Sequence, residues 1–113
     1  MQNKEDFKKR IAKCLLDGES FEVLFEERTT FKKDPYKKIY PNGLVEGKSL
    51  GLHKVIKIEK SVFVVSNATV EELPVYFGRN PDWSFPDGDT AVWTAKYNTT
   101  KFQGYYKFIY KFK

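Results

Sequence analysis

The stretch TAVWTAKYNTTKFQGYYKFIYKFK, from Thr90 to Lys113, carries the clearest pattern in the chain. Side chains alternate with a period of two over residues 90–97 and again over 102–112, and both runs are rich in aromatic and β-branched types. This period and these residue types predict two strands. Residues 98–101 (Asn-Thr-Thr-Lys) suit a short hairpin loop between them.

Folding the hairpin between Thr99 and Thr100 places Trp93 opposite Tyr106 and Ala91 opposite Phe108. The rings then share one face, and a slip of one residue would divide them between both faces. The other face is predicted to be wet and basic with a few apolar residues: it carries Lys96, Lys107, Lys111 and Lys113 with Tyr105, Thr94, Val92 and Ile109. From it we nominate four residues for nucleic acid: Lys96, Tyr105, Lys107 and Lys111. Two interpretations stay open for this surface, a solubilising exterior and a contact for phosphate or an acidic partner.

The N-terminal residues predict a helix over 3–17, with Asn3 as its N-cap and Gly18 as the glycine that ends it. Its apolar stripe consists of Phe7, Ile11, Cys14 and Leu15, which recur at helical spacing. Further strands are predicted over 20–31, 50–58, 62–66 and 74–77. The first of these also fits helical spacing, but its Phe, Val and Thr content favours a strand. We therefore expect one α+β domain over 1–113, with the helix packed on a curved antiparallel sheet of about five strands.

In a strand over 20–31, Glu22 and Glu26 project from the face opposite Phe21. Paired carboxylates can form a metal site or an acid–base device. The alternative, which we favour, is ion pairing with lysines on a neighbouring strand.

Composition narrows the class of protein. The 113 residues carry a formal net charge of +5 and 17% aromatic residues. Cys14 is the single cysteine, so no disulfide forms within the chain. No run is long and apolar enough to span a bilayer, and the charged N-terminal residues do not look like a signal peptide. We expect a cytoplasmic protein of a bacterial host cell with no membrane partner; its lysine-rich, alanine-poor composition fits AT-rich coding.

Two loops are candidate contact sites. Residues 31–47 interleave lysines with aromatic rings, and we nominate Tyr36, Lys37, Lys38 and Tyr40 for partner binding, with Lys32 and Lys33 added for nucleic acid. Residues 78–89 are predicted to be a polar loop, from which we nominate Arg79 and Trp83. The position of Trp83, either tucked onto the core or exposed as an anchor, stays open.

Catalytic motifs are missing from the sequence: it has no glycine-rich phosphate loop, no nucleophile elbow and no Cys/His metal spacing. We therefore expect a non-catalytic protein, without cofactor or metal, that binds a protein or nucleoprotein complex. In size and composition the chain resembles the small inhibitors encoded by phages and mobile elements, anti-CRISPR proteins among them. This resemblance implies a blocking mechanism.

Two alternatives are direct nucleic-acid binding through the basic and aromatic residues, and a small metal-independent nuclease with His53, the single histidine, as general base. The oligomeric state stays open.

Overall fold

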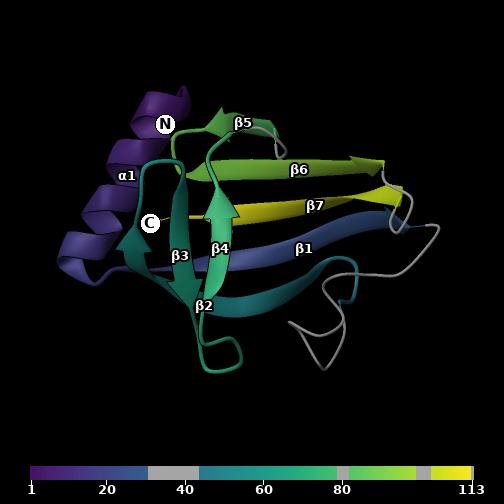
Figure 1. Cartoon of the computed structure of the whole chain (residues 1–113), viewed down its shortest axis with the longest axis horizontal. Helices are drawn as coiled ribbons and strands as arrows, with labels where there is room; N and C mark the ends of the chain where they lie inside the picture. Colours follow the sequence, from purple (N-terminus) through teal and green to yellow (C-terminus); the bar gives the residue numbers. More distant parts are fainter. Residues whose placement is uncertain (31–43, 79–81, 99–102, 113) are drawn as a thin grey trace.

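The computed structural model describes residues 1–30, 44–78, 82–98 and 103–112. These residues form one helix followed by seven strands (Figure 1): α1 (Lys4–Asp17), β1 (Ser20–Thr30), β2 (Lys48–Ile58), β3 (Val62–Ser66), β4 (Leu73–Tyr76), β5 (Asp82–Asp87), β6 (Thr90–Asn98) and β7 (Gln103–Lys111). The strands form one antiparallel sheet in the order β4-β3-β2-β1-β7-β6-β5. The predicted α+β fold is confirmed, and the sheet is larger than the expected five strands.

β5 corrects the sequence prediction, which treated residues 78–89 as a loop. Asp82–Asp87 pairs antiparallel with β6 and places Trp83 opposite Trp93. The register shifts between Ser84 and Asp87, where Pro86 lies. Proline has no backbone N–H to donate to a neighbouring strand, and an edge strand tolerates it at positions where this side faces solvent. The bulge and the proline hide the period of two in the sequence.

The β6–β7 hairpin has the predicted faces but a different register. Asn98 pairs with Gln103, Ala95 with Tyr106 and Trp93 with Phe108, a shift of two residues from the prediction. A shift of two leaves every side chain on its face because the pleat repeats every two residues. Both registers set Trp93 opposite a ring, but the observed one sets Ala91 and Ala95 opposite tyrosines, whereas the predicted one leaves Ala95 opposite Gly104.

α1 is capped as predicted. The side chain of Asn3 accepts a hydrogen bond from the backbone N–H of Asp6 at 2.9 Å, and Gly18 takes the left-handed conformation with φ of 66°. Phe7, Ile11 and Cys14 are buried. Leu15, expected in the same stripe, is 38% exposed, because the helix contacts the sheet over a narrower arc than its apolar residues cover.

Register shifts in β2 let the sheet curl. β2 has one extra residue against β1 near Gly51, whose φ is 90°, and another against β3 at Ile56. Bulges bend a strand and increase its twist. As a result β3 and β4 lie in front of the rest of the sheet in Figure 1. The edges β4 and β5 meet where the indole Nε1 of Trp83 donates a hydrogen bond to the carbonyl of Tyr76 at 3.1 Å.

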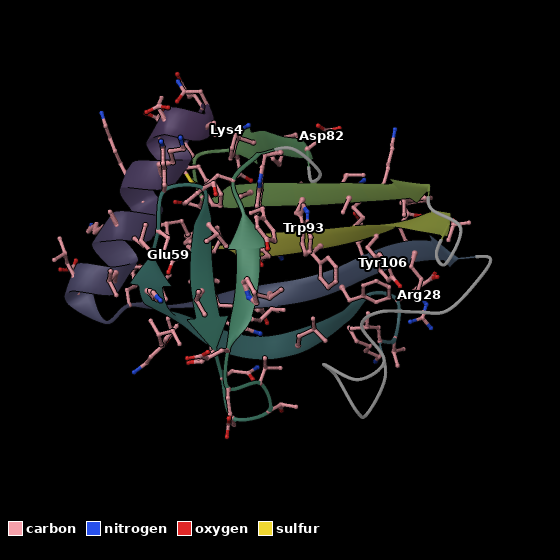
Figure 2. The ribbon with its side chains drawn as sticks, viewed as in Figure 1. Lys4, Arg28, Glu59, Asp82, Trp93 and Tyr106 are labelled. Atoms are coloured by element: carbon pink, nitrogen blue, oxygen red, sulfur yellow. The ribbon has the colours of Figure 1, made fainter. Side chains whose placement is uncertain are left out.

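The core lies inside the curled sheet and is closed at one end by α1. Figure 2 shows Trp93 and Tyr106 between the two halves of the sheet. Phe7 contributes from the helix and contacts five rings: Phe63, Phe77, Trp83, Phe85 and Phe112. Trp93, Tyr106 and Phe108 are all buried, which confirms that the rings of the last two strands turn inward together.

Candidate functional site

Most residues nominated for binding lie outside the part of the chain that the structure describes. These are Lys32, Lys33, Tyr36, Lys37, Lys38, Tyr40 and Arg79. Their role stays a prediction from the sequence. Trp83 and the four residues nominated from the predicted basic surface are described.

Charge is divided unevenly between the two parts of the chain. The described residues contain 13 basic and 14 acidic side chains, a net charge of −1. The remaining residues contain seven basic side chains and one acidic one, a net charge of +6. The segment 31–43 supplies four of those lysines together with Tyr36 and Tyr40. With Asp34, this segment has a net charge of +3, and the other three basic residues, Arg79, Lys101 and Lys113, lie elsewhere in the chain.

Trp83 lies on the core. Its ring is 4.4 Å from the ring of Phe7 between centroids and 5.6 Å from that of Tyr110, and its N–H is bonded to the carbonyl of Tyr76. The side chain is half-buried. Of the two positions that the sequence left open for Trp83, the structure shows the tucked one, where the ring joins the two edges of the sheet.

The predicted basic surface is the outer face of β6 and β7, and it also extends over β1. Lys111 lies opposite Glu22, and Lys107 lies opposite Glu27 beside the bulged residue Glu26. The ammonium of Lys107 is 3.3 Å from the carboxylate of Glu26. The expectation of a basic face is therefore corrected to one of mixed charge, because β1 lies beside β7 and contributes carboxylates. The ion pairing predicted for Glu26 is confirmed.

Two other nominated residues complete this outer face. Lys96 is exposed and lies opposite Tyr105, which is half-buried. Between the charged rows runs an apolar row, formed by the half-buried side chains of Leu24, Ile109 and Val92, which are cross-strand neighbours. The nominated lysines therefore do not gather into one cationic patch in the described residues.

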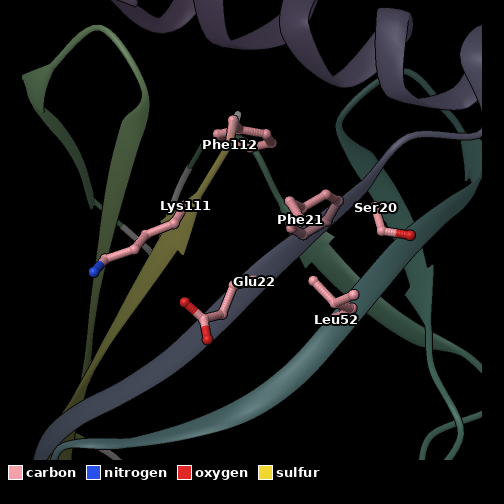
Figure 3. A pocket seen from close by; sticks show the side chains of 6 residues that line it. All are labelled: Ser20, Phe21, Glu22, Leu52, Lys111 and Phe112. Atoms are coloured by element: carbon pink, nitrogen blue, oxygen red, sulfur yellow. The ribbon is translucent and has the colours of Figure 1, made fainter.

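A pocket of about 310 Å³ opens where the β1–β7 ladder ends. Figure 3 shows the six residues that line it: Ser20, Phe21, Glu22, Leu52, Lys111 and Phe112. The volume is at the lower end for small-molecule sites. Sequence reasoning missed the pocket, because its walls come from three strands whose order no local pattern reveals.

His53 is buried and hydrogen-bonded. Its Nδ1 is 3.1 Å from the carbonyl of Gly51, which requires the proton on Nδ1, and its Nε2 is 3.3 Å from the amide nitrogen of Asn67, from which it accepts. Burial lowers the pKa of His53, and the bond to Gly51 opposes this shift. The imidazole is 1% exposed, so it is not placed to reach a substrate as a general base.

Other reactive groups are also held in structural positions. Cys14 is buried, and burial is the main cause that raises the pKa of its thiol, which disfavours the reactive thiolate. Glu22 accepts a hydrogen bond from the hydroxyl of Ser49 at 3.0 Å. Within residues 1–30, 44–78, 82–98 and 103–112, no three His, Cys, Asp or Glu side chains gather into a possible metal site.

Two further findings concern membrane helices and similar proteins. No helix among the described residues is long and apolar enough to cross a membrane. Comparison of the chain with protein-family models, with curated proteins and with solved structures gives no match.

Proposed function

We propose that this chain is a non-catalytic binding domain that acts on an acidic protein or nucleoprotein partner through the cationic segment 31–43. The observation that carries the proposal is the division of charge. Segment 31–43 has four lysines, one aspartate and two tyrosines in its sequence, a net charge of +3 in 13 residues, whereas the 92 described residues together carry −1. Several lysines in a short stretch create a positive potential that raises the association rate with an acidic surface. Tyrosine is a frequent interface anchor.

The proposal assigns the binding anchors to Tyr36 and Tyr40 and not to Trp83. The Trp83 ring packs on Phe7, and its N–H bonds Tyr76, so its loss would disturb the sheet as well as any contact. A blocking role, as in the small inhibitors that phages and mobile elements encode, fits a domain that presents one cationic segment. In this role the protein acts inside a bacterial host cell.

A second candidate is direct binding of single-stranded nucleic acid by the same segment. Lysines that follow phosphates and rings that stack on bases are the combination that such binding uses, at about 1–3 kcal/mol per stacked base. The mixed charge of the outer sheet face supports neither a duplex footprint nor a continuous phosphate track there. Nucleic-acid binding would therefore also depend on residues 31–43.

The test compares the wild-type chain with a Tyr36→Ala/Tyr40→Ala variant as bait in extract of the native host, with and without nuclease. We expect the wild-type chain to retain a protein partner after nuclease treatment, and the variant to lose at least about 90% of it. Ser84→Ala, on β5, is the matched control and should retain the partner. Recovery that disappears with nuclease would favour the second candidate. Equal recovery by the wild-type chain and the double variant would overturn both.

A further inference from the structure

The outer face of the sheet separates its charges by strand. β1 contributes the carboxylates of Glu22, Glu26 and Glu27, and β7 contributes the ammonium groups of Lys111 and Lys107. Lys111 is the cross-strand neighbour of Glu22, and Lys107 is paired with Glu26. An acidic column therefore runs beside a basic column, about 5 Å away at the usual strand spacing. The apolar row of Leu24, Ile109 and Val92 crosses both columns between the charged rows.

The charged side chains of this face can form further ion pairs. Glu22 and Lys111 are register partners, yet within the described residues their side chains form no ion pair with each other, and the carboxylate of Glu22 accepts from Ser49 instead. Figure 3 shows the Lys111 side chain extending past Glu22 toward the ribbon of β5 and β6. The backbone hydrogen bond from Asp89 is the main cause that lowers the pKa of Asp87, and the charge of Lys111 adds to this lowering. Glu26 and Lys107 do pair, but their side chains are 42% and 34% exposed and can accept a second partner. The face is therefore charged, patterned and open to further ion pairs.

We propose that a second copy of this chain docks on this face to form a symmetric dimer, with the two-fold axis parallel to the strands and between β1 and β7. This rotation places β1 of each copy over β7 of the other and leaves positions along the strands unchanged. Glu22 then faces Lys111 of the second copy, Glu27 and the bulged Glu26 beside it face Lys107, and Leu24 faces Ile109. An isologous interface needs this kind of self-complementarity, in which each contact occurs twice.

The same pattern excludes the other face-to-face arrangement. A two-fold axis perpendicular to the strands would place β1 over β1, so that Glu22 and Glu26 of one copy face Glu26 and Glu22 of the other. It would also place the lysines of β7 over one another. Like charges across an interface suppress a wrong arrangement. The separation of charge by strand therefore favours one orientation, and it keeps the strands of the two sheets aligned, as sheets that pack face to face prefer.

The size of the face indicates a weak dimer. The face consists of β2, β1, β7 and β6, which lie about 4.8 Å apart, and residues on one face of a strand repeat about every 6.8 Å. Four such residues on each of the four strands cover roughly 500 Å² per copy. About 1,000 Å² buried in total is below the usual range for stable complexes. We therefore expect reversible association with a dissociation constant on the order of 10–100 µM. None of the residues named for this face belongs to segment 31–43, so this inference does not depend on the proposed function.

The first test is sedimentation equilibrium of the wild-type chain from about 5 to 500 µM, where the average mass should rise from one copy toward two. Two charge-reversed variants then test the pairing: Glu22→Lys/Glu26→Lys and Lys107→Glu/Lys111→Glu. Each should weaken self-association at least about 30-fold, because four exposed ion pairs become four like-charge contacts. An equimolar mixture of the two variants should recover a dimer, since every proposed pair is restored across the interface.

Controls separate the proposal from a general effect of charge. Lys9→Glu/Lys13→Glu changes two exposed lysines on α1 and should leave the association unchanged. Circular dichroism melts establish that each variant is folded. A wild-type chain that stays monomeric up to 500 µM would overturn the proposal without any variant. A dimer that both reversed variants retain, or a mixture that stays monomeric although both variants are folded, would overturn it as well.

Discussion

The two faces of β1, β7 and β6 differ in how much one strand's sequence reveals about them. On the inner face, Phe25, Phe108 and Trp93 pack as neighbours, with 4.7 Å between the rings of Trp93 and Phe108. On the outer face, the same strands carry carboxylates, lysines and a narrow apolar row. Alternation along one strand is enough to find the inner face. The character of the outer face depends on which strand lies beside which.

The largest expected effect is on the inner side. Phe7→Ala should lower the free energy of unfolding by about 3–5 kcal/mol, because the ring is fully buried and contacts five others. Ile109→Ala, in the outer apolar row, should cost about 1 kcal/mol or less because that side chain is half-exposed. Urea denaturation at 25 °C measures both values. Equal losses in the free energy of unfolding for the two variants would contradict the proposed difference between the two faces.

His53 gives the inner side a pH dependence. Its pKa is lowered from 6.5 in the folded chain, so the unfolded chain binds a proton first as the pH falls. The stability from neutral His53 is present above pH 6.5 and is lost as the pH drops from there toward the folded pKa, by at most about 1.4 kcal/mol per pH unit. Denaturation curves of wild-type and His53→Gln chains between pH 7 and 5 should differ in slope, the wild-type being steeper. Parallel slopes would contradict the buried neutral imidazole.

The contact between the two edges of the sheet predicts a smaller effect. Trp83→Phe keeps an aromatic ring near Phe7 but removes the indole donor to the Tyr76 carbonyl, and should cost about 1 kcal/mol. Hydrogen exchange of the β4 amides should also accelerate. Ser84→Ala, the next residue on β5, should change stability by less than about 0.5 kcal/mol. Unchanged exchange in β4 after Trp83→Phe would show that the edges are held together without this bond.

Sequence alone predicted the helix, six of the seven strands and the inward rings, because each depends on local periodicity. It missed β5, where Pro86 and a bulge interrupt the alternation, and it misplaced the hairpin register by two residues. It predicted a basic outer face because it considered Lys107 and Lys111 with their own hairpin only. The carboxylates of β1 reach that face through a pairing between residues more than 80 positions apart, such as Glu22 and Lys111.

The candidate site was less accessible to sequence reasoning than the fold. A ring such as Trp83 carries no local sign of whether it packs inward or projects outward, and only the neighbouring Phe7 and Tyr76 decide it. The charge of residues 31–43 can be counted from the sequence.

The most direct test of the proposed function compares two sets of four lysines. Replacement of Lys32, Lys33, Lys37 and Lys38 by glutamine removes the four positive charges of the segment. Replacement of Lys9, Lys13, Lys54 and Lys60, all exposed, removes the same charge from the helix and sheet. Affinity for the partner recovered from the host, measured by titration calorimetry, should fall at least about tenfold for the first variant and less than about twofold for the second. Equal losses in the two variants would contradict the account.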